Sequence, residues 1–321
     1  MKTTDPLVMR AQGCLIGQLA GDALGSQVEF RPAETIRREY PEGVRDLAGS
    51  DIWHTLPGQP TDDSEMALTL ARMLAELGCY SPDAAMERYR SWLRSGPFDC
   101  GRTIGMALHG VVNENSQANG ALMRISPLGI FGARRPLTDV ALWAEQDAAL
   151  THPHVVCRQA NALYAMAIAH AVGTGAKPPQ LYEAIQDWAD SMAVDQSLFN
   201  AVQEAAHAPP ADFFRQQGWV LIAFQNALWQ LLHASCLEEG VIDTVMRGGD
   251  TDTTAAICGA LLGAVYGLEA IPDRWTQAIL HCRPQAGAPG VRQARPACFW
   301  PIDALELAET LVSHATATRG A

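Results

Sequence analysis

Two stretches of the chain carry glycine at every fourth position inside an apolar pattern of helical spacing. The glycines are Gly13, Gly17 and Gly21 within residues 7–24, and Gly259, Gly263 and Gly267 within residues 250–267. Because residues four apart lie on one face of an α-helix, each stretch predicts a helix with a glycine face. Glycine is a poor helix former, so such a face indicates that another backbone packs very close. We expect the two helices to cross in close contact at the core.

The rest of the chain also has a helical pattern, and no β-branched run alternates with period two. Residues 31–60 and 283–301 are rich in proline, glycine and charge and are expected to be mainly loop. Further helices are predicted at residues 62–77, 81–96, 138–150, 154–172, 179–192, 197–207, 219–238 and 303–312. We therefore expect an all-α protein. No linker divides the 321 residues, so a single domain over residues 1–321 is expected.

Charge and cysteine usage exclude several classes of partner. The formal net charge of -12 argues against nucleic acid and anionic membranes, both of which favour basic surfaces. The eight cysteines include no Cys-x-x-Cys pair and are expected to be buried thiols of a reducing compartment. Polar residues interrupt the apolar run after Leu7, so no signal peptide is predicted, and no window is long enough to span a membrane. A cytoplasmic protein is expected, with a monomer favoured.

The motif that says most about chemistry is Gly248-Gly249-Asp250-Thr251-Asp252-Thr253, at the start of the second glycine-faced helix. In an extended backbone its two carboxylates point the same way, and the glycines allow positive φ angles. Ligands that are all oxygen favour Mg²⁺, Mn²⁺ or Ca²⁺ over zinc or copper. One such motif cannot complete the coordination of a hard ion, so further oxygen ligands are required.

Thr61-Asp62-Asp63-Ser64 supplies a second acidic motif. Taken alone, Asp62 and Asp63 are explained by capping, with Asp62 as the N-cap of the helix that begins there. Together with Asp250 and Asp252 they make four carboxylates, which would repel one another strongly if held close. Such a neighbourhood requires neutralising cations, and two ions are expected.

Other polar residues stand out in apolar surroundings. Residues 21–30 contain Asp22 and Glu29 and are interpreted as a loop near the same site, or as a helix end followed by a solvated turn. Arg124 is a lone arginine among apolar residues, a setting in which arginine pairs with a carboxylate or a phosphate. His152 and His154 lie at a helix start, where they either contact an anionic ligand or serve as capping and core residues.

Several common catalytic motifs do not occur. The chain has no Gly-x-Ser-x-Gly elbow, Walker loop, His-Glu-x-x-His or Gly-x-Gly-x-x-Gly motif. Serine hydrolase, NTPase, zincin and dehydrogenase functions therefore lose their main support.

The motifs together, in this order, resemble those of the ADP-ribosylglycohydrolase family, and within it a bacterial branch that acts on ADP-ribosylarginine. The segments that carry the resemblance are Gly21 to Gly25, Thr61 to Met66, Asn119-Gly120 with Met123-Arg124 and Pro127, Thr151-His152, and Gly248 to Thr253. The resemblance runs from about residue 10 to 275. It implies a compact, orthogonal multi-helix fold with a binuclear Mg²⁺ or Mn²⁺ centre. It also implies hydrolysis of the N-glycosidic bond between ADP-ribose and a protein arginine, so that the partner is a mono-ADP-ribosylated protein.

The resemblance assigns roles to individual residues. The metal ligands it implies are Thr61, Asp62, Asp63, Asp250, Asp252 and Thr253, with Asp252 bridging both ions. The substrate cleft it implies is lined by Asp22, Asn119, Gly120, Met123, Arg124, His152, His154 and Trp219. Trp219 stands where the bacterial branch often has tyrosine, and Ser64 stands where threonine is commoner. Glu29 and Asp99 match acidic residues of that branch, and one of them is expected to transfer a proton.

Other functions compatible with these motifs stay open. A relative of the same family could cleave serine-linked ADP-ribose, a modified base or a small ADP-ribose derivative, because the metal motifs do not discriminate between linkages. A protein that keeps the fold without activity is disfavoured, because all the implied ligands are present. An immunity-type protein could remove ADP-ribose and also occlude an ADP-ribosyltransferase, in which case the arginine-rich residues 283–301 are the segment to examine.

Overall fold

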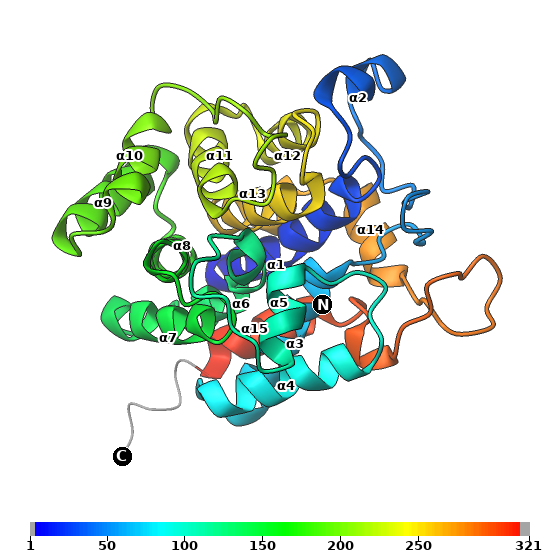
Figure 1. The fold of residues 1–321 in the computed structure, drawn as a ribbon, viewed down its shortest axis with the longest axis horizontal. Helices are drawn as coiled ribbons and strands as arrows, with labels where there is room; N and C mark the ends of the chain where they lie inside the picture. Colours follow the sequence, from blue (N-terminus) through cyan, green and yellow to red (C-terminus); the bar gives the residue numbers. More distant parts are fainter. Residues whose placement is uncertain (1–3, 315–321) are drawn as a thin grey trace.

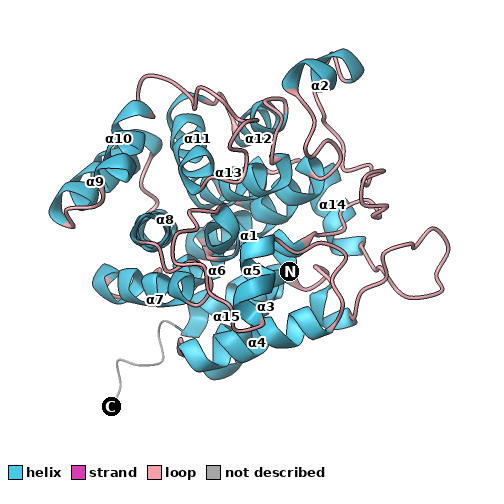
Figure 2. Ribbon diagram, viewed as in Figure 1, coloured by secondary structure: helices cyan, strands magenta, loops and turns pink. Residues whose placement is uncertain are grey.

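The computed structural model describes residues 4–314, and within them the chain is all-α, as predicted (Figures 1 and 2). The long helices are α1 (Pro6–Gly25), α3 (Asp62–Leu77), α4 (Pro82–Arg94), α7 (Leu137–Ala149), α8 (Val155–Thr174), α9 (Pro178–Ser191), α11 (Val220–His233), α13 (Thr251–Tyr266) and α15 (Ala304–His314). The shorter ones are α2 (Ala33–Glu39), α5 (Arg102–Leu108), α6 (Ser126–Phe131), α10 (Gln196–Glu204), α12 (Leu237–Val245) and α14 (Asp273–His281). Short 3₁₀ turns are η1 (Asn119–Arg124), η2 (Leu268–Ala270) and η3 (Ala297–Phe299).

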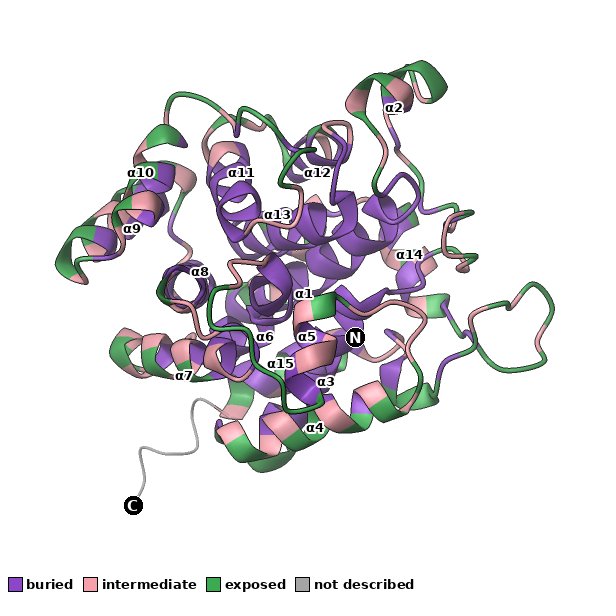
Figure 3. Ribbon diagram, in the orientation of Figure 1, coloured by how far each residue is buried: buried purple, intermediate pink, exposed green. Residues whose placement is uncertain are grey.

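Helices α1 and α13 pack backbone to backbone at the centre of the molecule (Figure 3). A Cβ atom added to Gly17 would lie 2.2 Å from the carbonyl oxygen of Gly259, and one added to Gly263 would lie 2.0 Å from that of Gly13. No side chain fits such gaps, so the close approach predicted from the glycine faces is confirmed. Gly267 is different, because it ends α13 with a φ of +78°.

The two helices run antiparallel in close contact from Gly13 to Gly25 of α1, which is more contact than the single crossing we expected. The contact continues at Gly21, whose added Cβ would lie 2.0 Å from the Ala255 oxygen, and at Gly25, where it would lie 2.4 Å from the Thr251 oxygen. The C-terminal end of α1 therefore meets the N-terminal end of α13. This alignment places the segment after α1 next to the acidic motif that begins α13.

The other helices surround this pair. Helices α8, α11 and α12 pack on α13, whereas α15 packs on α1 and on α3, and α4 covers α3. The first turn of α1 is capped by Asp5, whose carboxylate accepts a hydrogen bond from the Leu7 amide, and Pro6 has no amide proton to satisfy. Every residue of α13 from Thr251 to Val265 is buried, so its polar N-terminal turn lies inside the protein.

Residues 31–60 are mainly loop, as expected, and contain one short helix, α2. Other expectations about elements were incomplete or wrong, since α5, α6 and α14 were not predicted. The helix expected over residues 219–238 ends at His233, and a separate helix, α12, follows it. Thr61, and not Asp62 as expected, is the N-cap of α3. The helix therefore begins at Asp62, one residue earlier than an Asp62 cap would place it.

The cysteines are not all buried as expected. All eight cysteines are free, but Cys79, Cys236 and Cys298 are exposed and Cys100 is half-buried, so the expectation of buried thiols holds only for the other four. Within residues 4–314 no helix is long and apolar enough to cross a bilayer.

Candidate metal centre and active site

The segment after α1 is joined to the acidic motif before α13 by two backbone hydrogen bonds. The Phe30 amide donates to the Gly249 oxygen at 2.7 Å, and the Gly249 amide donates to the Arg31 oxygen at 3.1 Å. Gly248 and Gly249 have φ angles of +75° and +80°, and a Cβ on Gly249 would lie 2.0 Å from a backbone oxygen, so glycine is required there. This pairing places the Glu29 carboxylate beside the start of α13.

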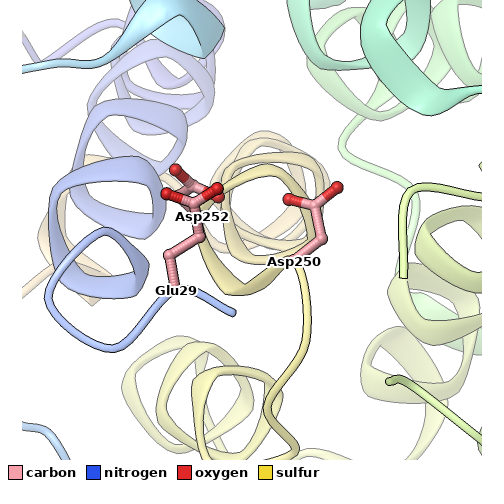
Figure 4. Close-up of side chains that lie close together, drawn as sticks. All are labelled: Glu29, Asp250 and Asp252. Carbon is pink, nitrogen blue, oxygen red and sulfur yellow. The ribbon is translucent and has the colours of Figure 1, made fainter. Parts of the chain in front are cut away.

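Glu29, Asp250 and Asp252 form a group of carboxylates, each with an oxygen within 4.8 Å of the others (Figure 4). In Figure 4 the Glu29 side chain rises next to Asp252, and Asp250 stands across from them. Asn119 donates its side-chain amide to Oδ2 of Asp250 at 2.8 Å, and the Thr253 amide donates to Oδ1 of Asp252 at 2.9 Å. Glu29 therefore lies among the expected metal ligands and not apart from them.

The second acidic motif reaches the same place on the first turn of α3. Thr61 donates its hydroxyl to Oδ1 of Asp22 at 2.9 Å, and the Thr61 and Ser64 amides also donate to the Asp22 carboxylate. Asp22 lies in the last turn of α1, which agrees with the helix-end alternative and not with the loop, and it satisfies free amides at the N-terminus of α3. These hydrogen bonds to Asp22 hold the turn that carries Asp62 and Asp63 against α1.

These acids open into one cleft of about 280 Å³. Asp99 lines it from the loop before α5, and the Gly101 amide of that loop donates to Oδ2 of Asp62 at 3.3 Å. The residues around the cleft are Glu29, Phe30, Asp62, Asp63, Asp99, Gly101, Arg102, Thr103, Ile104, Ala118, Asn119, Gly120, Met123, His152, Gly218, Asp250, Asp252 and Thr253. The structure therefore brings together six carboxylates from four segments that are distant in sequence.

Repulsion among the carboxylates disfavours their ionised forms unless cations neutralise the negative charge. Burial, and then the nearby Asp250 and Asp99 carboxylates, raise the pKa of Glu29 to about 8. Burial and neighbouring acids hold the pKa values of Asp62, Asp63 and Asp252 well above their usual range, and burial also raises those of Asp99 and Asp250. Buried carboxylates that raise one another's pKa in this way are typical of a site built for cations.

The donor set fits hard divalent ions. Oδ1 of Asp63 is buried and has no hydrogen-bond partner among the described residues, so it is available as a ligand. The carboxylate oxygens and the Thr253 hydroxyl that line the cleft suit Mg²⁺ or Mn²⁺. The Thr61 hydroxyl is already engaged by Asp22 and lies outside the cleft lining.

Arg124 does not line the cleft, because its side chain is bound to other residues in the protein interior. Its fully buried side chain donates to Oδ1 of Asp147 at 2.9 Å, to the Asp147 backbone oxygen at 2.9 Å and to the Thr151 hydroxyl at 2.9 Å. Its guanidinium also lies 4.4 Å from the centre of the Tyr89 ring. The carboxylate, not the phosphate, is therefore the partner of this lone arginine.

The two histidines have different roles. His152 lines the cleft, with Nδ1 2.8 Å from the Thr151 hydroxyl and Nε2 buried without a partner among the described residues. Burial and the Arg124 guanidinium lower the pKa of His152 to about 3, so a neutral ring faces the cleft. His154 caps α8 by accepting a hydrogen bond from the Val156 amide and does not line the cleft.

Trp219 also lies outside the cleft lining. Its indole donates to Oε1 of Gln117 at 2.9 Å, and the ring borders an open groove that continues from the cleft through Ala118 and Gly218. The substrate-facing role implied for Trp219 therefore concerns this groove and not the carboxylate cluster.

Sequence reasoning missed several residues around the cleft. Phe30 lines it with half of its surface exposed and a φ of +61°, and Arg102 and Ile104 line it from α5. The Trp53 indole donates to the Glu29 carboxylate, and Trp53 and Phe98 have ring centres 6.1 Å apart. The sequence signal that could have identified them was the presence of Trp53 and Phe98 in segments interpreted as loop. Large aromatic side chains in loops usually pack against a partner.

Known proteins with similar sequences indicate the family of this chain. A sequence profile of the ADP-ribosylglycohydrolase family matches residues 3–314. The chain is 30% identical over 277 residues to ADP-ribosyl-[dinitrogen reductase] glycohydrolase of Rhodospirillum rubrum, covering 83% of this chain and 88% of that protein. It is 26% identical over 295 residues to ADP-ribosylarginine hydrolase Tri1 of Pseudomonas putida (strain GB-1), covering 86% and 76%.

More distant and structural relatives extend the comparison. Chicken (Gallus gallus) ADP-ribosylhydrolase ARH3 is 26% identical over 334 residues, covering 85% of this chain and 89% of that protein. A solved structure described as an ADP-ribosylglycohydrolase-related protein complex superposes with a TM-score of 0.78 at 28% identity, covering 96% of this chain and 99% of that one. The chain therefore belongs to the ADP-ribosylglycohydrolase family, whose members are hydrolases that act on ADP-ribosyl linkages.

Proposed function

We propose that this protein removes ADP-ribose from arginine side chains of mono-ADP-ribosylated proteins, at a binuclear Mg²⁺ or Mn²⁺ centre. The observation that carries the proposal is the convergence of five buried carboxylates and the half-buried Asp99, from the loop before α5, on one cleft. The similarity to the ADP-ribosylarginine hydrolase of Pseudomonas putida supports the arginine linkage.

Asp62, Asp63, Asp250, Asp252 and Thr253 would hold the ions. When bound, two such ions supply Lewis acidity, fix the ribose diol and activate water. Asn119 orients Asp250 through its hydrogen bond, and Asp22 holds the first turn of α3 in place. The chain's own contribution is thus to fix the ligands before substrate arrives, which lowers the reorganisation required in the transition state.

Asp99 and Glu29 are the two acids that remain for proton transfer. Asp99 sits where a carboxylate could pair with a guanidinium in a two-point fork, and a serine hydroxyl would gain little from it. Glu29 is held by the Trp53 indole and lies among the metal ligands. We therefore assign the contact with the leaving arginine to Asp99. The neutral His152 ring can exchange one hydrogen bond with substrate through Nε2 but brings no charge.

The test compares linkages directly. Peptides carrying ADP-ribose on arginine or on serine are incubated with the protein and either Mg²⁺ or Mn²⁺, and release is followed by mass spectrometry. Release from arginine is expected. Asp99→Asn should lower that rate by about 10² or more, because it removes the carboxylate that manages the proton and the guanidinium charge. Cys100→Ser, which changes no charge beside it, serves as the control.

Two results would contradict the proposal. Release from serine but not arginine by the wild-type protein would assign it to another linkage of the same family. Full arginine activity in Asp99→Asn would leave Glu29 as the acid that transfers the proton.

An ADP-ribosyltransferase that makes the modification is the further partner proposed, and co-purification of the two proteins would test direct contact.

A further inference from the structure

The arginine-rich segment 283–301 is attached to the metal-binding side of the protein. The side-chain amide of Gln59, just before the first acidic motif, donates to the Gln293 oxygen at 2.7 Å. Farther along α3, Arg72 donates to the Cys298 oxygen at 2.8 Å and to the Trp300 oxygen at 3.0 Å. Between these two attachments Arg295 points inward.

Arg295 forms a buried ion pair with the first turn of α3. Its Nε and Nη2 donate to Oε1 and Oε2 of Glu65 at 2.7 and 2.8 Å, a two-point fork. Both side chains are 2% exposed. Glu65 lies two residues after Asp63 in the first turn of α3, and its carboxylate also accepts a hydrogen bond from the Trp92 indole at 2.7 Å.

The same guanidinium also holds the start of the Asp99 loop. Its Nη1 donates to the oxygens of Ser95 and Gly96 at 3.2 and 3.0 Å, and Nη2 donates to the Ser95 hydroxyl at 2.8 Å. Gly96 has a φ of +70° and begins the turn that leads to Asp99. At the other end of this loop the Gly101 amide donates to Asp62. The loop is therefore tied to α3 at both ends.

We propose that Arg295 is a positioning residue that sets the distance between the metal-binding turn of α3 and the Asp99 loop. A buried ion pair contributes little to stability compared with apolar side chains of the same volume, so stability alone does not account for this one. Its geometry does, because a planar fork with five donors can fix two segments relative to each other, which a single apolar side chain cannot. Residues 283–301 thereby become part of the catalytic architecture. This inference rests on the proposed metal centre and activity.

The test uses Arg295→Lys, which keeps the charge but loses the fork and most of the five hydrogen bonds. Arg72→Gln is the matched control, since it detaches the same segment from α3 farther from the ligands. The Mn²⁺ dissociation constant is measured by calorimetry, and kcat and KM are measured at saturating Mn²⁺ with an ADP-ribosylarginine peptide. Loss of a residue that supports metal ligands typically costs about 10- to 100-fold in affinity or activity. We expect this loss in Arg295→Lys, with a lower kcat, and wild-type Mn²⁺ affinity in Arg72→Gln.

Unchanged Mn²⁺ affinity and kcat in Arg295→Lys, or an equal loss in Arg72→Gln, would overturn the role of Arg295. If Arg295→Lys does not fold, the double variant Glu65→Gln with Arg295→Gln replaces it, because it removes both buried charges together, and the same losses are expected. Wild-type protein that fails to bind Mn²⁺ would instead overturn the metal centre on which the inference rests.

Discussion

Asp252 is a residue at which we expect the needs of function and of stability to conflict. It is buried, and after burial itself the largest influences that raise its pKa are the carboxylates of Glu29 and Asp63. In the absence of cations these groups repel one another, so removing one of them relieves the repulsion.

We predict that Asp252→Asn abolishes detectable hydrolysis and weakens Mn²⁺ binding by at least about 10-fold, while the metal-free variant melts at or above the wild-type temperature. Calorimetry in EDTA and a Mn²⁺ titration measure the two effects. Asp243→Asn, which removes a carboxylate paired with Arg247 outside the cluster, is the control and should change neither Mn²⁺ affinity nor turnover. Normal turnover of Asp252→Asn at micromolar Mn²⁺ would contradict the assignment of Asp252 as a ligand.

At the scale of elements, the glycine faces of α1 and α13 invert the usual effect of a glycine-to-alanine change. In an ordinary helix the change stabilises by roughly 0.5–1 kcal/mol. At Gly17 the new Cβ would lie 2.2 Å from the Gly259 oxygen, which is backbone and cannot move aside.

Gly17→Ala should therefore destabilise the protein by about 1–3 kcal/mol, and Gly17→Leu by more, as overpacking does. Gly105→Ala in α5 is the matched control, because its Cβ would meet only the Cys100 sulfur, at an ordinary 3.6 Å. Denaturant unfolding measures both. A stability for Gly17→Ala equal to or above that of the wild type would mean that the two helices are not in backbone contact.

How far the sequence predicts these elements depends on how local their signals are. The long helices and the contact of α1 with α13 are predictable because their apolar and glycine spacing is visible within one segment. Helices α5 and α6, of 7 and 6 residues, carry no such pattern and are fixed by the core around them.

The site divides in the same way. Asp62, Asp63, Asp250 and Asp252 could be identified because their motifs are contiguous. The pairs Arg124 with Asp147 and Arg295 with Glu65 could not, because each joins residues far apart in sequence and nothing local specifies the partner. The position of Asp22 on α1 and not in a loop depends likewise on the close contact with α13.

For the whole molecule, the raised pKa values of the carboxyl groups in the cleft make the free energy of unfolding depend on pH. A carboxyl whose folded pKa lies above its unfolded value takes up a proton on folding, so its stabilising contribution is present at low pH and is lost as pH rises through the folded pKa. For Glu29 that folded value is about 8.

We predict that the metal-free protein melts at a lower temperature at pH 8 than at pH 6, and that Mn²⁺ raises the melting temperature more at pH 8, because fewer protons must then be displaced. Scanning calorimetry in EDTA and in Mn²⁺ tests both statements. Asp252→Asn should flatten the metal-free pH dependence, whereas Glu76→Gln, which removes an exposed carboxylate paired with Arg88, should not. A metal-free melting temperature that rises from pH 6 to pH 8 would contradict the prediction.

We further propose that the chain unfolds in a single transition, as one domain would.

The antiparallel contact of α1 with α13 has a consequence for biosynthesis. Gly17 and Gly259 are far apart in sequence, yet each occupies the space that a side chain of the other would need. Helix α1 therefore finds its partner only after all the residues between the two helices have been translated, and closing so long a loop slows folding. Until then its apolar surface is a target for chaperones and for aggregation. The group formed by Glu29, Asp250 and Asp252 joins the segment after α1 to the start of α13, so it assembles only once α13 has been translated.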